Sequence, residues 1–418
     1  MLVPRPRLAW IRSTSSGLKV SRCPSRGWFR DILFSNGNRQ VATKKIFRVG
    51  VIGASGKGDY GHGIDMTFAG LERAKIVAVA DEHPAGLQKA AQRLEVNRHY
   101  ADFRKMLEKE KLDIVCVGPR WVNDRVAMVS AAADSEAHIY CEKPFAADLV
   151  MADAMIAACR RHQVKLAMAH QWRAMPPVQQ AIRQVRQGKY GKLLRVIARP
   201  KDDSRGGGEE LLVHGTHLFD MMLAFAGTPR WVSGHVLVGE RSATLADRRT
   251  GTEPIGPIVG DSISAMFGFS NGVRGYFEST AQLSKRGNKD FDNLYGLTLE
   301  CQQARLQIRQ PGDVYVYPAP CVLADLEKLE WEKQWLEAWH FTPEHKPRPI
   351  RSQWLRLGNK YLANNLMDAI EKGQEPLSGL QHAQWITEMV QGVYASHLSA
   401  GERLDIPLTQ RVHPLLSP

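Results

Sequence analysis

The 418-residue sequence lacks the features that mark membrane-spanning or disulfide-rich proteins. A membrane-crossing helix needs about 20 apolar residues in a row, and every apolar run here is much shorter, so we predict no membrane segment. The six cysteines are scattered without a CxxC pair, which favours reduced thiols and a cytoplasmic protein. We find no internal repeat, and a composition of 44% apolar and 24% charged residues is ordinary for a globular chain long enough for two domains.

Acidic residues are scarce only at the amino terminus. Residues 1–45 hold ten Lys or Arg and one acid, Asp31, a net charge of +9, which leaves +4 of the total +13 for the rest. This near balance argues against nucleic acid as a partner. The leader has no apolar signal core, so we expect a disordered arm, a transit-type peptide or, as we favour, sequence ahead of the true start, because residues 41–45 directly precede the first strand.

A strand followed by a glycine-rich loop opens the globular part. Residues 46–52 are typical of a buried strand, and residues 64–71 have a helical pattern. Glycines between them would let the backbone approach a pyrophosphate at the helix amino end. The loop departs from the GxGxxG pattern because a serine stands at the middle glycine position. The alternative is that these glycines serve ordinary turns. The predicted cofactor-binding residues of this loop are Gly53, Ser55, Gly56, Lys57 and Gly58.

A second strand, at 75–80, closes on Asp81. A carboxylate there can accept hydrogen bonds from both ribose hydroxyls and repels a 2′-phosphate, so NAD is favoured over NADP. The alternative is that Asp81 caps a helix from Pro84. Strands and helices then alternate as far as a strand at 164–169, which predicts a doubly wound parallel sheet, a Rossmann domain over residues 46–169.

The stretch from Ile139 to Pro144 ends a strand in an acid, a base and a proline. Because ligands of open parallel sheets bind beyond the carboxyl ends of the strands, we expect Glu142 and Lys143 beside the reactive part of a cofactor. A lysine can take the proton of a hydroxyl there if burial and a nearby cation lower its pKa from about 10.4. The alternative is a surface lysine paired with Glu142.

Together with Gly206-Gly207-Gly208 and the box from His214 to Asp220, these elements resemble the Gfo/Idh/MocA family of NAD(P)-dependent oxidoreductases, over residues 46–418. The resemblance implies that an α+β domain, residues 170–418, follows the Rossmann domain. It implies a large open, mainly antiparallel sheet, a carboxyl-terminal helix that packs back toward the first domain, and a homodimer or homotetramer. It also implies that Lys143 contacts the nicotinamide ribose and the reacting hydroxyl, and that His217 completes the proton path.

The second half has the pattern of such a domain. Period-2 runs predict an antiparallel sheet, with a hairpin turn at Asn271-Gly272. Residues 323–349 are rich in Trp, Lys and Glu and predict a helix or an ordered surface excursion, and helices are expected at 359–372 and 381–400. The expected strands are 193–198, 232–238, 262–269, 275–280, 295–300, 305–309 and 314–317, with a short last one at 404–407.

The candidate site residues fall into three groups. Lys143 and His217 are the predicted catalytic residues. Pro119, Glu142 and Lys143 join the glycine loop and Asp81 as cofactor-binding residues. No metal is expected, because His214 and His217, which could share one helix face, have no third ligand at a recognisable spacing. The predicted substrate-binding residues are Trp172, Arg173, His214 and His217, and positive charge from Arg120, Arg173, Lys201 and Arg205 makes a carboxylated or phosphorylated substrate plausible.

Two positions depart from the family pattern. Val213 stands where an aspartate is common, four residues before His217, and Asn123 stands where a histidine is usual. Either His214 replaces the aspartate in the proton relay, or the reaction differs from plain sugar dehydrogenation. Asp220 is expected to orient His217 or to cap a helix.

The favoured function is hydride transfer between NAD and a secondary hydroxyl of a sugar, polyol or sugar acid. One alternative is an NAD-assisted glycoside hydrolase or lyase with no net redox change. Another is a dinucleotide-binding protein without catalysis.

Overall fold

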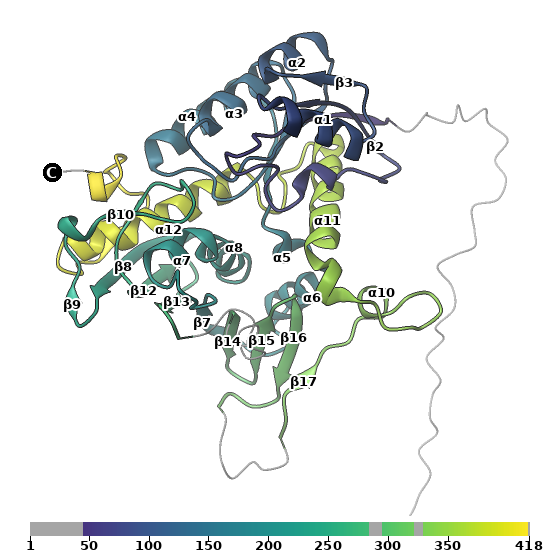
Figure 1. Cartoon of the computed structure of the whole chain (residues 1–418). Coiled ribbons are helices and arrows are strands. Elements are labelled where there is room, and N and C mark those ends of the chain that lie inside the picture. Colours follow the sequence, from purple (N-terminus) through teal and green to yellow (C-terminus); the bar gives the residue numbers. More distant parts are fainter. Residues whose placement is uncertain (1–44, 284–294, 322–328, 417–418) are drawn as a thin grey trace, which may run out of the picture. The chain divides into compact units, whose positions relative to one another are not determined.

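The chain from Lys45 onward forms one compact unit built on two sheets (Figure 1). A computed structural model describes residues 45–283, 295–321 and 329–416, so the leader predicted at 1–45 lies, except for Lys45, outside the described residues. The predicted fold class is confirmed: a Rossmann α/β domain and an α+β domain with a large, mainly antiparallel sheet. Within the described ranges, no helix has both the length and the apolar character to cross a membrane.

The first sheet consists of six parallel strands in the order β3-β2-β1-β4-β5-β6. Its central strands are continuous apolar runs because helices cover both faces, and all four residues of β4 are buried. The order reverses direction between β1 and β4, which creates a switch point at the carboxyl ends of the strands. The strands are β1 (Phe47–Ile52), β2 (Ala74–Ala80), β3 (Arg98–Tyr100), β4 (Ile114–Val117), β5 (His138–Cys141) and β6 (Leu166–Met168).

Two layers of helices enclose this sheet. The helices α2 (Phe103–Lys109), α3 (Arg125–Asp134) and α4 (Leu149–Arg161) share one core with one face, and α1 (Pro84–Arg93) and α11 (Ile350–Lys372) share another with the opposite face. The side chains of Asp102 and Asp148 cap α2 and α4 by accepting bonds from backbone N–H groups in the first turn.

The predicted helix at 64–71 is wrong. Only one 3-10 turn, η1 (Ile64–Met66), forms there. Gly61, Gly63 and Gly70 all have positive φ, so the backbone turns where a helix would need φ near −60°, and no side chain caps η1. The helix whose amino end was expected to face a pyrophosphate therefore does not form at residues 64–71.

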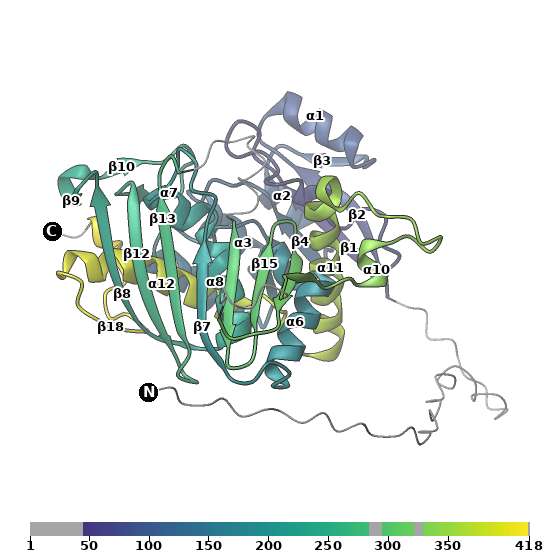
Figure 2. The same ribbon diagram turned by 90° about the horizontal axis from the view of Figure 1, so that it is seen from below.

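The second sheet has the strand order β17-β16-β15-β14-β7-β13-β12-β8-β18, with β9 beside β8. All its pairs are antiparallel except β13 with β7. Side chains of α6, α8 and α12 pack on one face of this sheet. Figure 2 views the sheet from its opposite, open face, with these helices behind the strands. The strands are β7 (Leu193–Arg199), β8 (Pro229–Val238), β9 (Arg241–Ser242), β12 (Ser262–Phe269), β13 (Arg274–Thr280), β14 (Gly296–Cys301), β15 (Arg305–Arg309), β16 (Asp313–Tyr317), β17 (Glu332–Lys333) and β18 (Leu404–Asp405); β10 (Arg249–Thr250) and β11 (Pro257–Ile258) form a separate pair.

The hairpin predicted at Asn271-Gly272 is confirmed, because Gly272 has a φ of 80° and its N–H donates to the carbonyl of Phe269 over 3.0 Å. Residues 323–328 of the predicted excursion at 323–349 lie outside the described ranges, and the remainder holds β17 and a short helix, α10. The helices of this half are α5 (Gln171–Ala174), α6 (Pro176–Arg186), α7 (Gly208–Val213), α8 (Gly215–Ala226), α10 (Glu337–His340) and α12 (Leu380–Leu398), with 3-10 turns η2 (Leu245–Asp247) and η3 (Pro414–Leu416).

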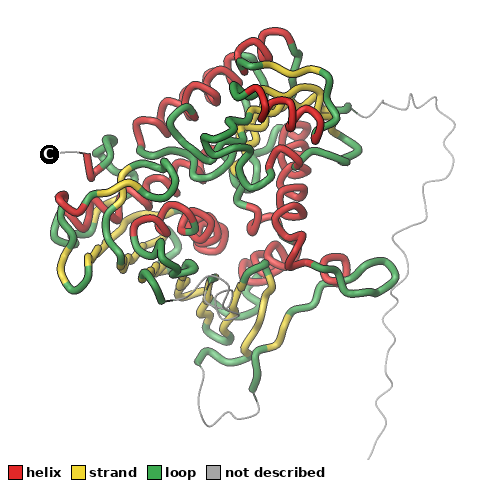
Figure 3. Tube along the Cα trace, viewed as in Figure 1, coloured by secondary structure: helices red, strands yellow, loops and turns green. Residues whose placement is uncertain are grey.

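Two long carboxyl-terminal helices tie the two sheets together (Figure 3, helices in red). Tyr140 of β5 donates to Asn359 of α11 over 2.7 Å. Gln391 of α12 donates to the carbonyl of Ala147, just before α4, over 3.0 Å, while the same helix covers β8. The loops at the carboxyl edge of the first sheet are therefore held against the second half of the chain.

Candidate active site

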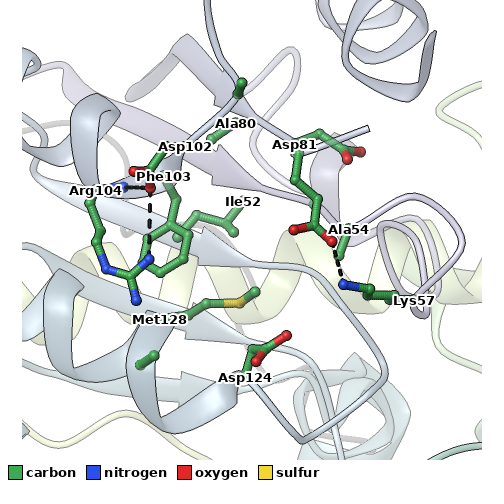
Figure 4. Close-up of a pocket in the computed structure, with 14 residues that line it drawn as sticks. Ile52, Ala54, Lys57, Ala80, Asp81, Asp102, Phe103, Arg104, Asp124 and Met128 are labelled. Atoms are coloured by element: carbon green, nitrogen blue, oxygen red, sulfur yellow. Dashed lines mark hydrogen bonds and ion pairs between the residues drawn. The ribbon is translucent and has the colours of Figure 1, made fainter. Parts of the chain in front are cut away.

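A cavity of about 420 Å³ lies at the carboxyl edge of the first sheet (Figure 4). The ends of β1 and β2 and the amino ends of α2 and α3 line it, which is the place where open α/β sheets bind their ligands. A smaller cavity of about 170 Å³ shares part of this lining and extends it to Pro119 and Trp121. The polar lining residues of the larger cavity are Lys57, Asp81, Glu82, Asp102, Arg104 and Asp124.

The carboxylate of Asp81 is held firmly in the wall of this cavity. It accepts hydrogen bonds from the hydroxyl of Ser55 at 2.7 Å, the hydroxyl of Tyr60 at 2.8 Å and the backbone N–H of His83 at 3.0 Å. The alternative that Asp81 caps α1 is wrong, because the cap is His83, whose Nδ1 accepts from the N–H of Gly86. Asp81 instead ties the glycine loop to the end of β2.

The glycine loop packs against its own chain more closely than side chains would allow. A Cβ on Gly53 would lie 2.2 Å from the ring of Tyr60, and a Cβ on Gly58 would lie 2.6 Å from the backbone nitrogen of Arg120. A Cβ on Gly56, in contrast, would meet no atom of the described residues within 4 Å, and the φ of Gly56 is 82°. At its glycines the loop thus brings backbone close to the cavity wall, as a dinucleotide site requires.

Lys143 and Glu142 are buried, so the alternative of a surface ion pair is wrong. The ammonium nitrogen of Lys143 donates to the carbonyl oxygen of Val213 over 3.1 Å. Burial lowers the pKa of Lys143 below its usual value, although nearby carboxylates act in the opposite direction. Burial also raises the pKa of Glu142, but the charge and hydrogen bond of His62, at 2.8 Å, together with Lys143, reverse that effect and leave the pKa below its usual value.

Sequence reasoning missed Arg125, which holds the loops around Lys143. Its guanidinium is fully buried and donates to the carbonyl oxygens of Glu142, Pro144 and Pro119. These carbonyls belong to the two loops that follow β4 and β5. An arginine in the first turn of a predicted helix gives no sign of such a contact before the strands are placed side by side.

His217 and His170, which was not among the predicted site residues, lie together near Lys143. Their rings meet edge to face, with centroids 5.2 Å apart. Burial lowers the pKa of His217 well below 6.5, with smaller effects from the charges of His170 and Lys143. Burial likewise lowers the pKa of His170 to about 4. Both imidazoles are therefore neutral near pH 7, and the available signal for His170 was its position directly after the sixth strand.

A buried carboxyl group lies one helical turn before Val213. Burial raises the pKa of Glu210 to about 8, and one of its oxygens shares a hydrogen bond with Nδ1 of His214. His214 is the C-cap of α7 and the N-cap of α8, three residues before His217. The ring of Tyr295 lies 5.1 Å from His214 and 4.7 Å from Trp172, between centroids, and encloses this group.

The expected surplus of positive charge is neutralised at three positions. Arg173 donates to Asp220 over 3.0 Å, Arg205 pairs with Asp203 at 2.6 Å, and Arg120 pairs with Glu253 at 3.1 Å. Arg173 and Asp220 are buried together, and Asp220 lies in the middle of α8, so the expectation that it caps a helix is wrong. Asn123 is exposed and lines the small cavity.

In the described part of the chain, no three His, Cys, Asp or Glu side chains are grouped to hold a metal ion. The site therefore consists of an edge cavity of about 420 Å³ and a group formed by the buried Lys143, His170 and His217 with the partly buried His214. A doubly wound sheet of this kind, followed by a second domain with a large mixed sheet, defines the class of two-domain proteins built on a nucleotide-binding Rossmann fold.

Comparison with known proteins agrees with this class. Residues 47–170 match the family described as "Oxidoreductase family, NAD-binding Rossmann fold". D-apiose dehydrogenase of Paraburkholderia graminis is 33% identical over 151 residues, which are 36% of this chain and 39% of that protein. Levoglucosan dehydrogenase of Pseudarthrobacter phenanthrenivorans is 25% identical over 235 residues, or 50% of this chain and 60% of that protein. The matches thus span less than two thirds of either relative.

The solved structure of levoglucosan dehydrogenase in complex with NADH and levoglucosan has the same fold, with a TM-score of 0.69 at 18% identity, over 87% of this chain and all of that one. The family model that residues 47–170 match is that of the Gfo/Idh/MocA oxidoreductases. The predicted resemblance is confirmed.

Proposed function

We propose that this protein is an NAD-dependent oxidoreductase that acts on a secondary hydroxyl of a sugar, polyol or sugar acid. The observation that carries the proposal is the meeting of Lys143, from the end of β5, with the α7–α8 segment of the second half. Lys143 donates to Val213 over 3.1 Å, and its charge contributes to the lowered pKa of His217. A proton acceptor at the carboxyl edge of a Rossmann sheet is what alcohol oxidation requires.

Residues 46–169 would bind the dinucleotide and residues 170–418 would form the substrate side. The large cavity would take the adenosine half, with Asp81 toward the ribose. The two cations that line this cavity, Lys57 and Arg104, already have carboxylate partners, Glu82 at 2.6 Å and Asp102 at 3.8 Å. That balance disfavours an additional 2′-phosphate and supports NAD over NADP. The residues that would hold the cofactor are Gly53, Ser55, Gly56, Lys57, Gly58, Asp81, Pro119, Glu142 and Lys143.

NAD, when bound, would supply the hydride acceptor. Lys143 would take the hydroxyl proton, since burial favours the neutral form of its amino group. Glu142 would hold the ring of His62 through their hydrogen bond. His217 would complete the proton path as a neutral imidazole. His214 with Glu210 supplies the carboxyl group that Val213 does not, which supports His214 in place of the family aspartate. Trp172 and Tyr295 would exclude water from this side.

Carbohydrate-like substrates are supported by what the relatives are named for. They include D-apiose and levoglucosan dehydrogenases and the myo-inositol 2-dehydrogenase of Thermotoga maritima, which is 28% identical over 48% of this chain and 62% of its own length. Because Arg120, Arg173 and Arg205 are already paired, we favour a neutral polyol or sugar over a phosphorylated one.

We further propose a homodimer or homotetramer in the cytoplasm. The open face of the second sheet carries exposed Leu194 and Leu237 and half-buried Tyr276 among polar side chains, a surface that a second copy can cover. Five cysteines of the described residues are free, and four of them are buried, which supports a reducing compartment. The solution mass from light scattering would test the assembly.

The proposed function is tested by replacing Lys143. A panel of sugars and polyols is screened with NAD for formation of NADH. We expect Lys143→Met to lower kcat by about 10²–10⁴-fold, and to weaken NAD binding, measured by calorimetry, by a smaller factor because the other cofactor-binding residues remain. Lys165→Met is the matched control, because Lys165 pairs with Glu375 away from the site.

Three outcomes would contradict the proposal. Full activity of Lys143→Met would place the chemistry elsewhere. Glycoside cleavage without net NADH would favour the NAD-assisted lyase, and NAD binding without turnover of any compound would favour a non-catalytic dinucleotide-binding protein.

A further inference from the structure

His170 occupies the junction between the two sheets. It follows β6 directly, precedes α5 and is 2% exposed. Its ring meets that of His217 of α8 at 5.2 Å, and Lys143 contributes to the lowered pKa of both histidines. The proposed function above assigns no role to His170, although it lies in the same group.

Hydrogen-bond partners decide which nitrogen of His170 carries the proton. Nδ1 lies 3.0 Å from the hydroxyl oxygen of Ser378, and that hydroxyl donates its single proton to Asp220 over 2.8 Å. The Ser378 oxygen can therefore only accept from His170, so Nδ1 must be protonated. Since burial keeps this imidazole neutral, with a pKa of about 4, Nε2 is left as a bare acceptor.

The bare nitrogen has no partner. Nε2 of His170 is buried and has no hydrogen bond among the described residues, and the same holds for Nδ1 of the neighbouring His217. A buried polar atom without a partner is costly and calls for an explanation. Two such atoms on facing rings, next to a buried lysine, match a ligand that carries several hydroxyl groups close together.

We propose that His170 is a substrate-binding residue whose Nε2 accepts a hydrogen bond from a hydroxyl of a polyol or sugar, and that Ser378 and Asp220 hold it in the Nδ1–H tautomer. This inference rests on the proposed function for its substrate class. Ser378 and Asp220 are positioning residues, and Arg173 holds Asp220 in turn through its bond of 3.0 Å. The reacting proton remains with Lys143, so the role of His170 is recognition.

The tautomer is measured first, without substrate, on the full chain labelled with ¹⁵N in its 14 histidine rings. Long-range ¹H–¹⁵N spectra should show a protonated Nδ1 and a bare Nε2 for the signal that disappears in His170→Gln. His413 is an internal control with the opposite tautomer, because its Nδ1 accepts from the N–H of Leu415 over 3.1 Å. Ser378→Ala removes the hydroxyl that accepts from Nδ1 of His170 and should give a mixture of tautomers.

Ligand binding and kinetics follow. A polyol that is turned over should shift the Nε2 signal of His170 but not that of His413. His170→Phe should raise KM for the polyol about tenfold or more with kcat within a few-fold, and His170→Gln, which keeps an acceptor at the position of Nε2, should recover part of the loss.

Each contrary result is distinct. A proton on Nε2 in the unliganded protein, or equal shifts of His170 and His413, overturns the inference. An active enzyme whose KM is unchanged in His170→Phe also overturns it, because a buried water would then satisfy Nε2, while the proposed function stands. If the tautomer is as stated but no polyol is turned over or bound, the proposed function fails and this inference fails with it.

Discussion

The ammonium nitrogen of Lys143 lies 3.1 Å from the carbonyl oxygen of Val213, the residue at which the family pattern predicts an aspartate. The lysine thus gains a backbone dipole where an aspartate would provide a full negative charge. A neutral partner compensates desolvation less than a carboxylate does, so the pKa of Lys143 lies below its usual value.

Val213→Asp should therefore raise the pKa of Lys143. In this variant the acid limb of the kcat/KM profile should move to higher pH by about one unit, since a nearby opposite charge favours the protonated lysine. Val213→Asn, of the same shape without the charge, is the control and should leave the limb nearly in place. Equal movement in both variants would show that Lys143 is not the group observed.

Asp81→Asn should relax the preference for NAD. Removing the negative charge at the end of β2 while keeping a hydrogen-bonding side chain should improve the ratio of NADP to NAD affinity about tenfold, equivalent to about 1.4 kcal/mol. Competition calorimetry with both dinucleotides measures the ratio. Asp124→Asn, an exposed carboxylate of the same cavity, should give a smaller change. An unchanged ratio in Asp81→Asn would mean that Asp81 serves only the loop.

Glu210→Gln should reduce the loss of stability that the unchanged protein shows as pH rises. The pKa of Glu210 is raised to about 8, above its unfolded value of about 4.3, so the folded state keeps a proton that the unfolded state has lost between these values. The free energy of unfolding therefore falls with pH across this window, by up to about 1.4 kcal/mol per unit, and glutamine removes that slope. The free energy of unfolding in urea, measured at pH 5.5, 6.5 and 7.5, tests this prediction. The same dependence on pH in the variant and the unchanged protein would contradict it.

Arg125→Met should lower the free energy of unfolding by about 3 kcal/mol or more and raise the dissociation constant of NAD. The guanidinium donates to carbonyls of two loops, and its loss leaves these buried acceptors without partners. Arg104→Met, on the mostly exposed Arg104 of the neighbouring α2, should change stability by less than about 0.5 kcal/mol. Similar stability losses in both variants would refute the role of Arg125 as the anchor of these loops.

Local sequence patterns sufficed for most strands. The predicted segments 262–269 and 305–309 agree with β12 and β15 residue for residue, because alternating apolar runs are decided by short-range periodicity. The same reasoning failed at 64–71, where three glycines with positive φ override a helical pattern. Lys143 and His217 were found because each sits in a distinctive local motif.

The tertiary structure alone decided which side chains surround them. Ser378 is 208 residues from His170 and 158 from Asp220, and Arg125 reaches three carbonyls on two loops. No periodicity or spacing encodes such contacts, since they arise when the carboxyl edge of a parallel sheet and a returning helix meet. Burial then moves the pKa values of Lys143, His170 and Glu210, and burial is a property of the packed chain rather than of any segment of it.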